Sequence, residues 1–186
     1  MRLVAISTLA AVSLLAAGCS KNDHDSDDAL PASTSASDAA AISSSVANPD
    51  QTFVDAAAAS DAFEIQSSQL AATKATSDKV KAFAEEMIKA HTASTAKLKS
   101  VAAGATPALT PNPTLPPAQQ ARLDALSSKS GADFNKAYSL AQIDAHQATL
   151  SALKSYAANG DMPGLKEFAG SLVPTVNDHL KMAQGL

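Results

Sequence analysis

The sequence contains no tryptophan, a single cysteine and only 4% aromatic residues. One cysteine cannot form an internal disulfide, so a disulfide-stabilised fold is excluded. β-Branched runs are scarce, whereas alanine, leucine, lysine and serine are common, which favours packed helices over a β-sheet core. The net charge is −4 and no basic patch stands out, so nucleic-acid binding is not expected.

The N-terminal segment has the pattern of a secretion signal. Arg2 is followed by an apolar run of roughly 15 residues, which suits a signal peptide better than a membrane span of about 20. The run ends in LAAGC, residues 15–19, which resembles the lipobox of bacterial lipoproteins. That resemblance implies removal of residues 1–18 and lipidation of Cys19, which would anchor the chain in a membrane. Ser20 in place of aspartate implies the outer membrane, facing the periplasm. The alternative is an ordinary signal peptide with an incidental cysteine.

A polar segment separates Cys19 from the rest of the chain. Residues 20–49 hold five aspartates and one lysine, with no sustained apolar period. Such a segment buries too little surface to offset the entropy of ordering, so we interpret 19–49 as a lipidated N-terminus and disordered tether. Residues 50–186 hold thirteen acidic and twelve basic residues, and we assign them to one nearly neutral folded domain.

Four long helices are expected in this domain. The first runs from a cap at Asp50 or Thr52 to about Lys74, and the second follows Ser77 or Asp78 and ends near Gly104. The third covers residues 132–158 and the fourth 162–182, the latter with Asp161 as its cap and Pro174 as an expected kink. The apolar stripe expected on the first helix comprises Phe53, Ala56, Ser60, Phe63, Ser67 and Leu70.

The connections between these helices predict the topology. Two or three residues join the first helix to the second, and a similarly short turn joins the third to the fourth. Each of these pairs is therefore expected to be antiparallel. About 28 residues join the second helix to the third, with five prolines between Pro107 and Pro117 and a short helix over 118–128. Short, long and short connections predict an all-α, ferritin-like four-helix bundle with one long crossover that contains a short extra helix.

Three of the four helices carry a histidine on the predicted core stripe. His91 follows Val80, Phe83 and Met87 at spacings of three and four, and His146 and His179 occupy equivalent places in the third and fourth helices. One such histidine is usually a hydrogen-bonded core residue, but three buried imidazoles cost free energy unless they share partners.

The depth of each residue follows from a rise of ~1.5 Å per helical residue. Glu64, His91 and His146 each lie about 14 residues into their helices, which puts them at one level near the middle of the bundle. His179 lies about 17 residues into the last helix, one to two turns from that level. These four residues are the candidate metal ligands, and imidazole with carboxylate suits zinc, iron or copper.

A di-iron oxidase centre is not expected. Such bundles need Glu-x-x-His on two helices, whereas Ile88, Ile143 and Val176 stand three residues before the histidines. Glycine-rich phosphate loops and nucleophile elbows are absent as well. We therefore expect the protein not to be an enzyme.

Three segments resemble a known family: DAFEIQSSQLAATKATSDKVKAFAEEMIKAHTAST, SGADFNKAYSLAQIDAHQATL and LKEFAGSLVPTVNDHL. They are similar to the DUF4142 family of ferritin-like bacterial envelope proteins, over residues 50–186. The resemblance implies the fold and an envelope location, but no activity. The family pattern has Asp-His in the second helix; here Ala90 precedes His91, so we expect His91 to lack an acidic partner. The matching positions are Glu64, His91, Asp144, His146, Pro174 and His179.

Three functions remain open at this point. The first is a non-enzymatic envelope lipoprotein with a structural, interaction or stress-related role, attached to the membrane through its lipid. The second is a module that binds a transition metal or small ligand among the buried histidines. The third, a redox or metal-oxidising enzyme, would need open coordination positions and turnover with peroxide or oxygen.

Overall fold

The computed structural model describes residues 48–186. The predicted signal peptide (1–18), the predicted lipidation site Cys19 and the predicted tether up to residue 47 lie outside the described residues. Within the described part no helix is both long and apolar enough to cross a membrane. That part consists of five helices: α1 (Pro49–Lys74), α2 (Asp78–Ala103), α3 (Pro117–Ser127), α4 (Gly131–Asn159) and α5 (Pro163–Gln184).

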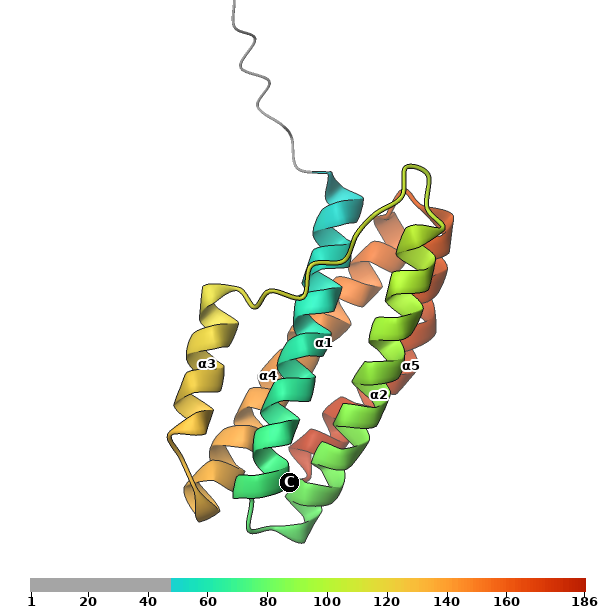
Figure 1. Cartoon of the computed structure of the whole chain (residues 1–186). Coiled ribbons are helices and arrows are strands. Elements are labelled where there is room, and N and C mark those ends of the chain that lie inside the picture. The colour runs from blue at the N-terminus through green and yellow to red at the C-terminus, as the bar shows by residue number, and fades with distance from the viewer. Residues whose placement is uncertain (1–47) are drawn as a thin grey trace, which may run out of the picture. The chain divides into compact units, whose positions relative to one another are not determined.

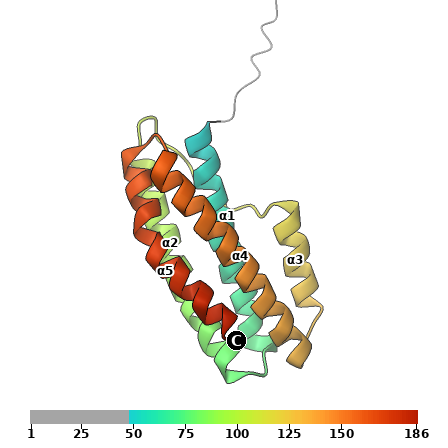
Figure 2. The ribbon, with the colours of Figure 1, turned by 180° about the vertical axis from the view of Figure 1, so that it is seen from behind.

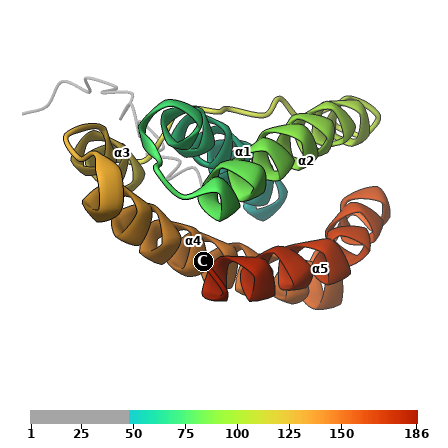
Figure 3. The same ribbon diagram turned by 90° about the horizontal axis from the view of Figure 1, so that it is seen from below.

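The four long helices form two antiparallel hairpins packed face to face (Figure 1). α1 and α2 make one layer and α4 and α5 the other, as the view along the bundle shows (Figure 3). Residues 104–130 connect the two hairpins along the length of the bundle, and α3 in this connection packs against α1 and α4 (Figure 2). The predicted all-α bundle with one long crossover and a short extra helix is confirmed.

Two of the predicted helix starts were wrong. α1 begins at Pro49 with Asn48 as its cap, whose side chain accepts a hydrogen bond from the Asp50 amide at 2.9 Å. Asparagine next to a first-turn proline is a strong start signal, and it takes precedence over Asp50 or Thr52. Likewise α5 begins at Pro163 rather than at an Asp161 cap, because proline in the first turn needs no amide partner.

The buried face of α1 also differs from the predicted stripe. Ala56 is exposed and Leu70 is half-buried, whereas Val54, Ala58 and Asp61 are buried. α1 packs against α2, α4 and α3, so its buried surface is wider than the single stripe that a helix with one neighbour would show. One consequence is that an acidic residue, Asp61, lies inside the bundle.

The apolar core is divided into two clusters along the bundle axis. One, which we call the Phe168 cluster, contains Phe53, Leu98, Leu153 and Phe168. The other, the Tyr138 cluster, contains Phe63, Phe83, Phe134 and Tyr138. On each long helix, buried polar residues stand between the residues of the two clusters. We call this set the polar layer; its titratable members are Asp61, Glu64, His91, His146 and His179.

Candidate metal centre

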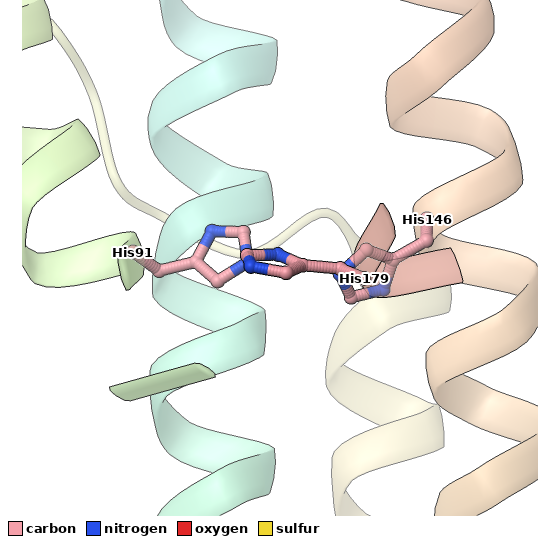
Figure 4. A group of neighbouring side chains, drawn as sticks. All are labelled: His91, His146 and His179. Carbon is pink, nitrogen blue, oxygen red and sulfur yellow. The ribbon is translucent and has the colours of Figure 1, made fainter. Parts of the chain in front are cut away.

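Three imidazole rings meet in the polar layer. His91 comes from α2, His146 from α4 and His179 from α5, and the side chains point toward one another (Figure 4). The ring centroids are 5.6–5.9 Å apart. Each ring has one nitrogen that can act as a ligand, such that these three nitrogens all lie within 4.8 Å of one another. This spacing allows one ion to contact all three rings after small side-chain movements, since copper and zinc bind imidazole nitrogen at about 2 Å.

Each ring leaves one nitrogen without a partner. The three side chains are 1–5% exposed, and among the described residues nothing hydrogen-bonds to Nε2 of His91, Nε2 of His146 or Nδ1 of His179. An unpaired buried polar atom costs about 1–3 kcal/mol. Three such atoms on neighbouring rings are costly together, and a bound cation would remove that cost.

His91 is held by an acid from another helix. Its Nδ1 lies 2.8 Å from Oδ1 of Asp61, and Thr95 donates a hydrogen bond to Oδ2 of the same carboxylate at 3.2 Å. With Nδ1–H donated to Asp61, Nε2 is left as the free, ligand-type nitrogen. The expectation that His91 lacks an acidic partner was therefore wrong: Ala90 cannot supply one, but α1 does.

His146 is oriented by the backbone. Its Nδ1 donates to the carbonyl oxygen of Gln142, one turn earlier on α4, at 2.8 Å. Oε1 of Glu64 lies 3.6 Å from the same Nδ1, on the side of the ring away from the free Nε2. Glu64 is 1% exposed and neither of its oxygens accepts a hydrogen bond from the described residues. The carboxylate thus stands behind His146 rather than in front of it.

His179 lies closer to the other histidines than its predicted depth implied. Counted from the turn between α4 and α5, His146 is 13 residues before the end of α4 and His179 is 16 residues after the start of α5. The difference of three residues is about 4.5 Å, less than one turn. The estimate of one to two turns used the predicted bounds, in which the third helix ends at residue 158 and the fourth begins at residue 162. In the structure α4 extends to Asn159 and α5 begins only at Pro163, which brings the two histidines to more similar levels.

Burial and neighbouring charges set the protonation states of the layer. Burial raises the pKa of Glu64 to about 7, against an ordinary value of 4.5, although the charge of His91 lowers it in part. Burial lowers the pKa of His146 to about 4 and also lowers that of His179. Burial acts in the same direction on His91, but the hydrogen bond to Asp61 and the charge of Glu64 outweigh it, and the pKa of His91 is raised.

Neutral imidazole is the form that binds metals, and burial favours that form at His146 and His179. Asp61 and, in its ionised form, Glu64 would supply the negative charge that a buried cation needs. The residues present therefore fit a transition-metal ion with nitrogen ligands, such as copper or zinc. Asp144, which matched the family pattern, takes no part: it forms an exposed ion pair with Arg122 at 3.0 Å.

Sequence reasoning named the four residues Glu64, His91, His146 and His179, and the structure places all four in the polar layer. It missed Asp61. One signal was available: Asp61 stands three residues before Glu64, which puts both carboxylates on neighbouring parts of one helix face.

Comparisons with known proteins agree with the fold. The model of a domain of unknown function, DUF4142, matches residues 34–186. No curated protein matches the chain. Two solved structures are similar, CopM in its Cu(I)-bound form and CopM in its Cu(II)-bound form, with TM-scores of 0.61 and 0.62. In both cases the identity is 16%, and the match covers 73% of this chain and 93% of the other.

Proposed function

The chain belongs to the DUF4142 family, and from this premise and the geometry of its polar layer we propose that it is a copper-binding protein. His91, His146 and His179 would hold the ion. The observation that carries the proposal is the convergence of three buried imidazole nitrogens that have no partner among the described residues. Of the functions that the sequence left open, metal binding is the one that this arrangement supports.

Copper is favoured over zinc and iron for two reasons. Imidazole nitrogen binds all three, but among divalent first-row ions copper forms the strongest complexes with such donors. In addition, the similar solved structures are of a protein with Cu(I) and with Cu(II) bound. A histidine-only set of ligands accommodates both oxidation states, so bound copper would supply a buried, redox-capable cation.

Metal analysis of the purified, untagged protein tests this proposal. After incubation with Cu(I) or Cu(II) and removal of excess ion, we expect about one copper per chain. His146→Ala should lower copper affinity at least tenfold, because it removes one of three ligands. His24→Ala, outside the described residues, is the matched control and should retain copper. A wild-type protein that remains free of copper under both conditions would refute the proposal.

We also propose that the protein works in the bacterial envelope, bound to the outer membrane by a lipid on Cys19. The support is the LAAGC sequence at residues 15–19 together with the following Ser20. In this proposal the protein binds and holds metal without turnover. Cys19→Ala should move the protein from the membrane fraction to the soluble fraction of cells. Unchanged membrane association of that variant would contradict the anchor.

A further inference from the structure

A cavity of about 40 Å³ adjoins the histidines on one side. All four long helices contribute to its wall, and His91 and His179 are among the lining residues, whereas His146 is not. One water needs roughly 10–15 Å³ of such volume. The cavity therefore has room for a molecule of two or three heavy atoms beside the two imidazoles.

The wall of this cavity is mainly apolar. Ala57, Leu153, Phe168, Leu172 and Val176 supply much of it. Among its polar groups, both Asp61 oxygens accept hydrogen bonds and the Thr149 hydroxyl pairs with Ser60 at 2.8 Å, while Ser94 and Thr175 add two uncharged hydroxyls. No lysine or arginine of residues 48–186 lines it. Such a wall disfavours an anion and admits an uncharged molecule.

Neither acid of the polar layer is free to occupy the position between the imidazoles and this cavity. Glu64 lies behind His146, next to the nitrogen bonded to Gln142, and it does not line the cavity. Asp61 lines it, but its oxygens are occupied by His91 and Thr95. Three imidazoles leave at least one position of a copper or zinc ion open, and the cavity adjoins His91 and His179, where a small molecule could reach it.

We infer that this cavity is a binding pocket for a small uncharged molecule, of the size of a diatomic gas, which occupies the open position of the ion held by the three histidines. The inference rests on the proposed copper site. It assigns the protein a second ligand besides the metal. The size of the apolar side chains around Ala57 then decides which molecules fit into the cavity.

Carbon monoxide is a suitable probe, because it is uncharged, fits the cavity and binds Cu(I). The copper(I)-loaded chain is exposed to carbon monoxide without oxygen, and the C–O stretching band is measured by infrared spectroscopy. We expect one carbon monoxide per copper and a single narrow band, as for a molecule held in one environment.

Two substitutions narrow the pocket, each from a different helix. Ala57→Val on α1 and Ala90→Val on α2 each add two carbons at the cavity wall, and each should weaken carbon monoxide binding at least tenfold with copper content unchanged. The matched control is Ala56→Val, the same change at an exposed neighbouring position of α1 that does not line this cavity. It should bind carbon monoxide like the wild type.

The outcomes separate this inference from the proposed function. Copper-loaded wild type that takes up no carbon monoxide would overturn the pocket and leave the copper site intact. Binding unchanged in both Ala57→Val and Ala90→Val would equally overturn it. Failure to bind copper at all would refute the proposed function, and the pocket with it. Circular dichroism of each variant checks that the bundle has folded, and if one variant fails to fold the other decides.

Discussion

At the scale of single residues, the candidate metal ligands and the acidic residues behind them have different roles. The three histidines face the candidate metal position, while Asp61 and Glu64 stand behind His91 and His146. A carboxylate behind a ligating histidine fixes its orientation and makes it a stronger donor. Asp61 would therefore orient His91 toward a bound metal without touching the ion, whereas Glu64 lies behind His146 without a hydrogen bond to it.

Removal of the support behind His91 should weaken copper binding. Asp61→Ala leaves all three imidazoles but removes the acceptor of the Nδ1 hydrogen bond, so we expect a loss of copper affinity of about 10–100-fold. Competition titration with a copper chelator measures it. Asp55→Ala, on the same helix but outside the polar layer, is the control. Equal affinities of the wild type and Asp61→Ala would show that the hydrogen bond does not support the ligand.

The buried acid and base should give opposite pH dependence to the metal-free protein. Glu64 has a pKa of about 7 in the folded chain and 4.5 ordinarily, so the stability associated with its neutral form is complete below pH 4.5 and lost as the pH rises through about 7. His146 has a pKa of about 4 against 6.5, so its contribution is complete above pH 6.5 and lost as the pH falls through about 4.

Single substitutions should reveal the two opposing effects, which largely cancel in the wild type. Relative to wild type, Glu64→Gln should gain stability as the pH rises from 4.5 to 7, and His146→Gln should lose it over the same interval. Each change is at most about 3 kcal/mol, from about 1.4 kcal/mol per pKa unit. Urea unfolding in the presence of a chelator measures both. Parallel pH profiles of the two variants would contradict the assignment.

At the scale of the helices, how much the sequence could predict depended on the neighbours of each helix. α2 packs mainly on α1 and α5, and its stripe of Val80, Phe83, Met87 and His91 was predicted correctly. α1 contacts three helices and is built largely from alanine and serine, so hydrophobic periodicity could not locate its buried face. Asp61 was missed for that reason. The level of His179 depended on where α4 ends and α5 begins, and a sequence fixes helix bounds such as Pro163 only to within one or two residues.

The start of α4 offers a test of local backbone conformation. Gly131, its first residue, has φ of +59°, in the left-handed region that costs other residues roughly 1–2 kcal/mol. No atom lies within 4 Å of an added Cβ there, so Gly131→Ala should destabilise by about 1 kcal/mol through conformation alone. Gly104→Ala, where φ is −81° and the nearest atoms are at ordinary contact distance, should be near neutral. Urea unfolding of both variants decides, and equal stabilities would contradict the prediction.

At the scale of the whole molecule, the candidate ligands join the two hairpins. His91 belongs to the α1–α2 hairpin, and His146 and His179 belong to the α4–α5 hairpin. Within each hairpin the helices pack extensively, whereas between the hairpins the packing is less extensive. An ion bound by all three histidines would therefore bridge the less tightly packed interface of the bundle.

Copper should raise the thermal stability of the protein through this bridge. An ion that binds only the folded state adds about 4 kcal/mol of stability at a free concentration 1,000 times its dissociation constant. We expect a melting temperature several degrees higher with copper than with a chelator present. His179→Ala should show little of this shift. A wild-type melting temperature that is unchanged by stoichiometrically bound copper would contradict the bridging role.

The polar layer also has a consequence for cooperativity. It separates the Phe168 cluster from the Tyr138 cluster in the middle of every long helix, so we expect each apolar half-core of the metal-free bundle to open while the other stays closed. Amide hydrogen exchange should then follow two rates, one for each half of the bundle. Once an ion binds the layer, opening of either half would disturb its ligands, and the two rates should merge into one.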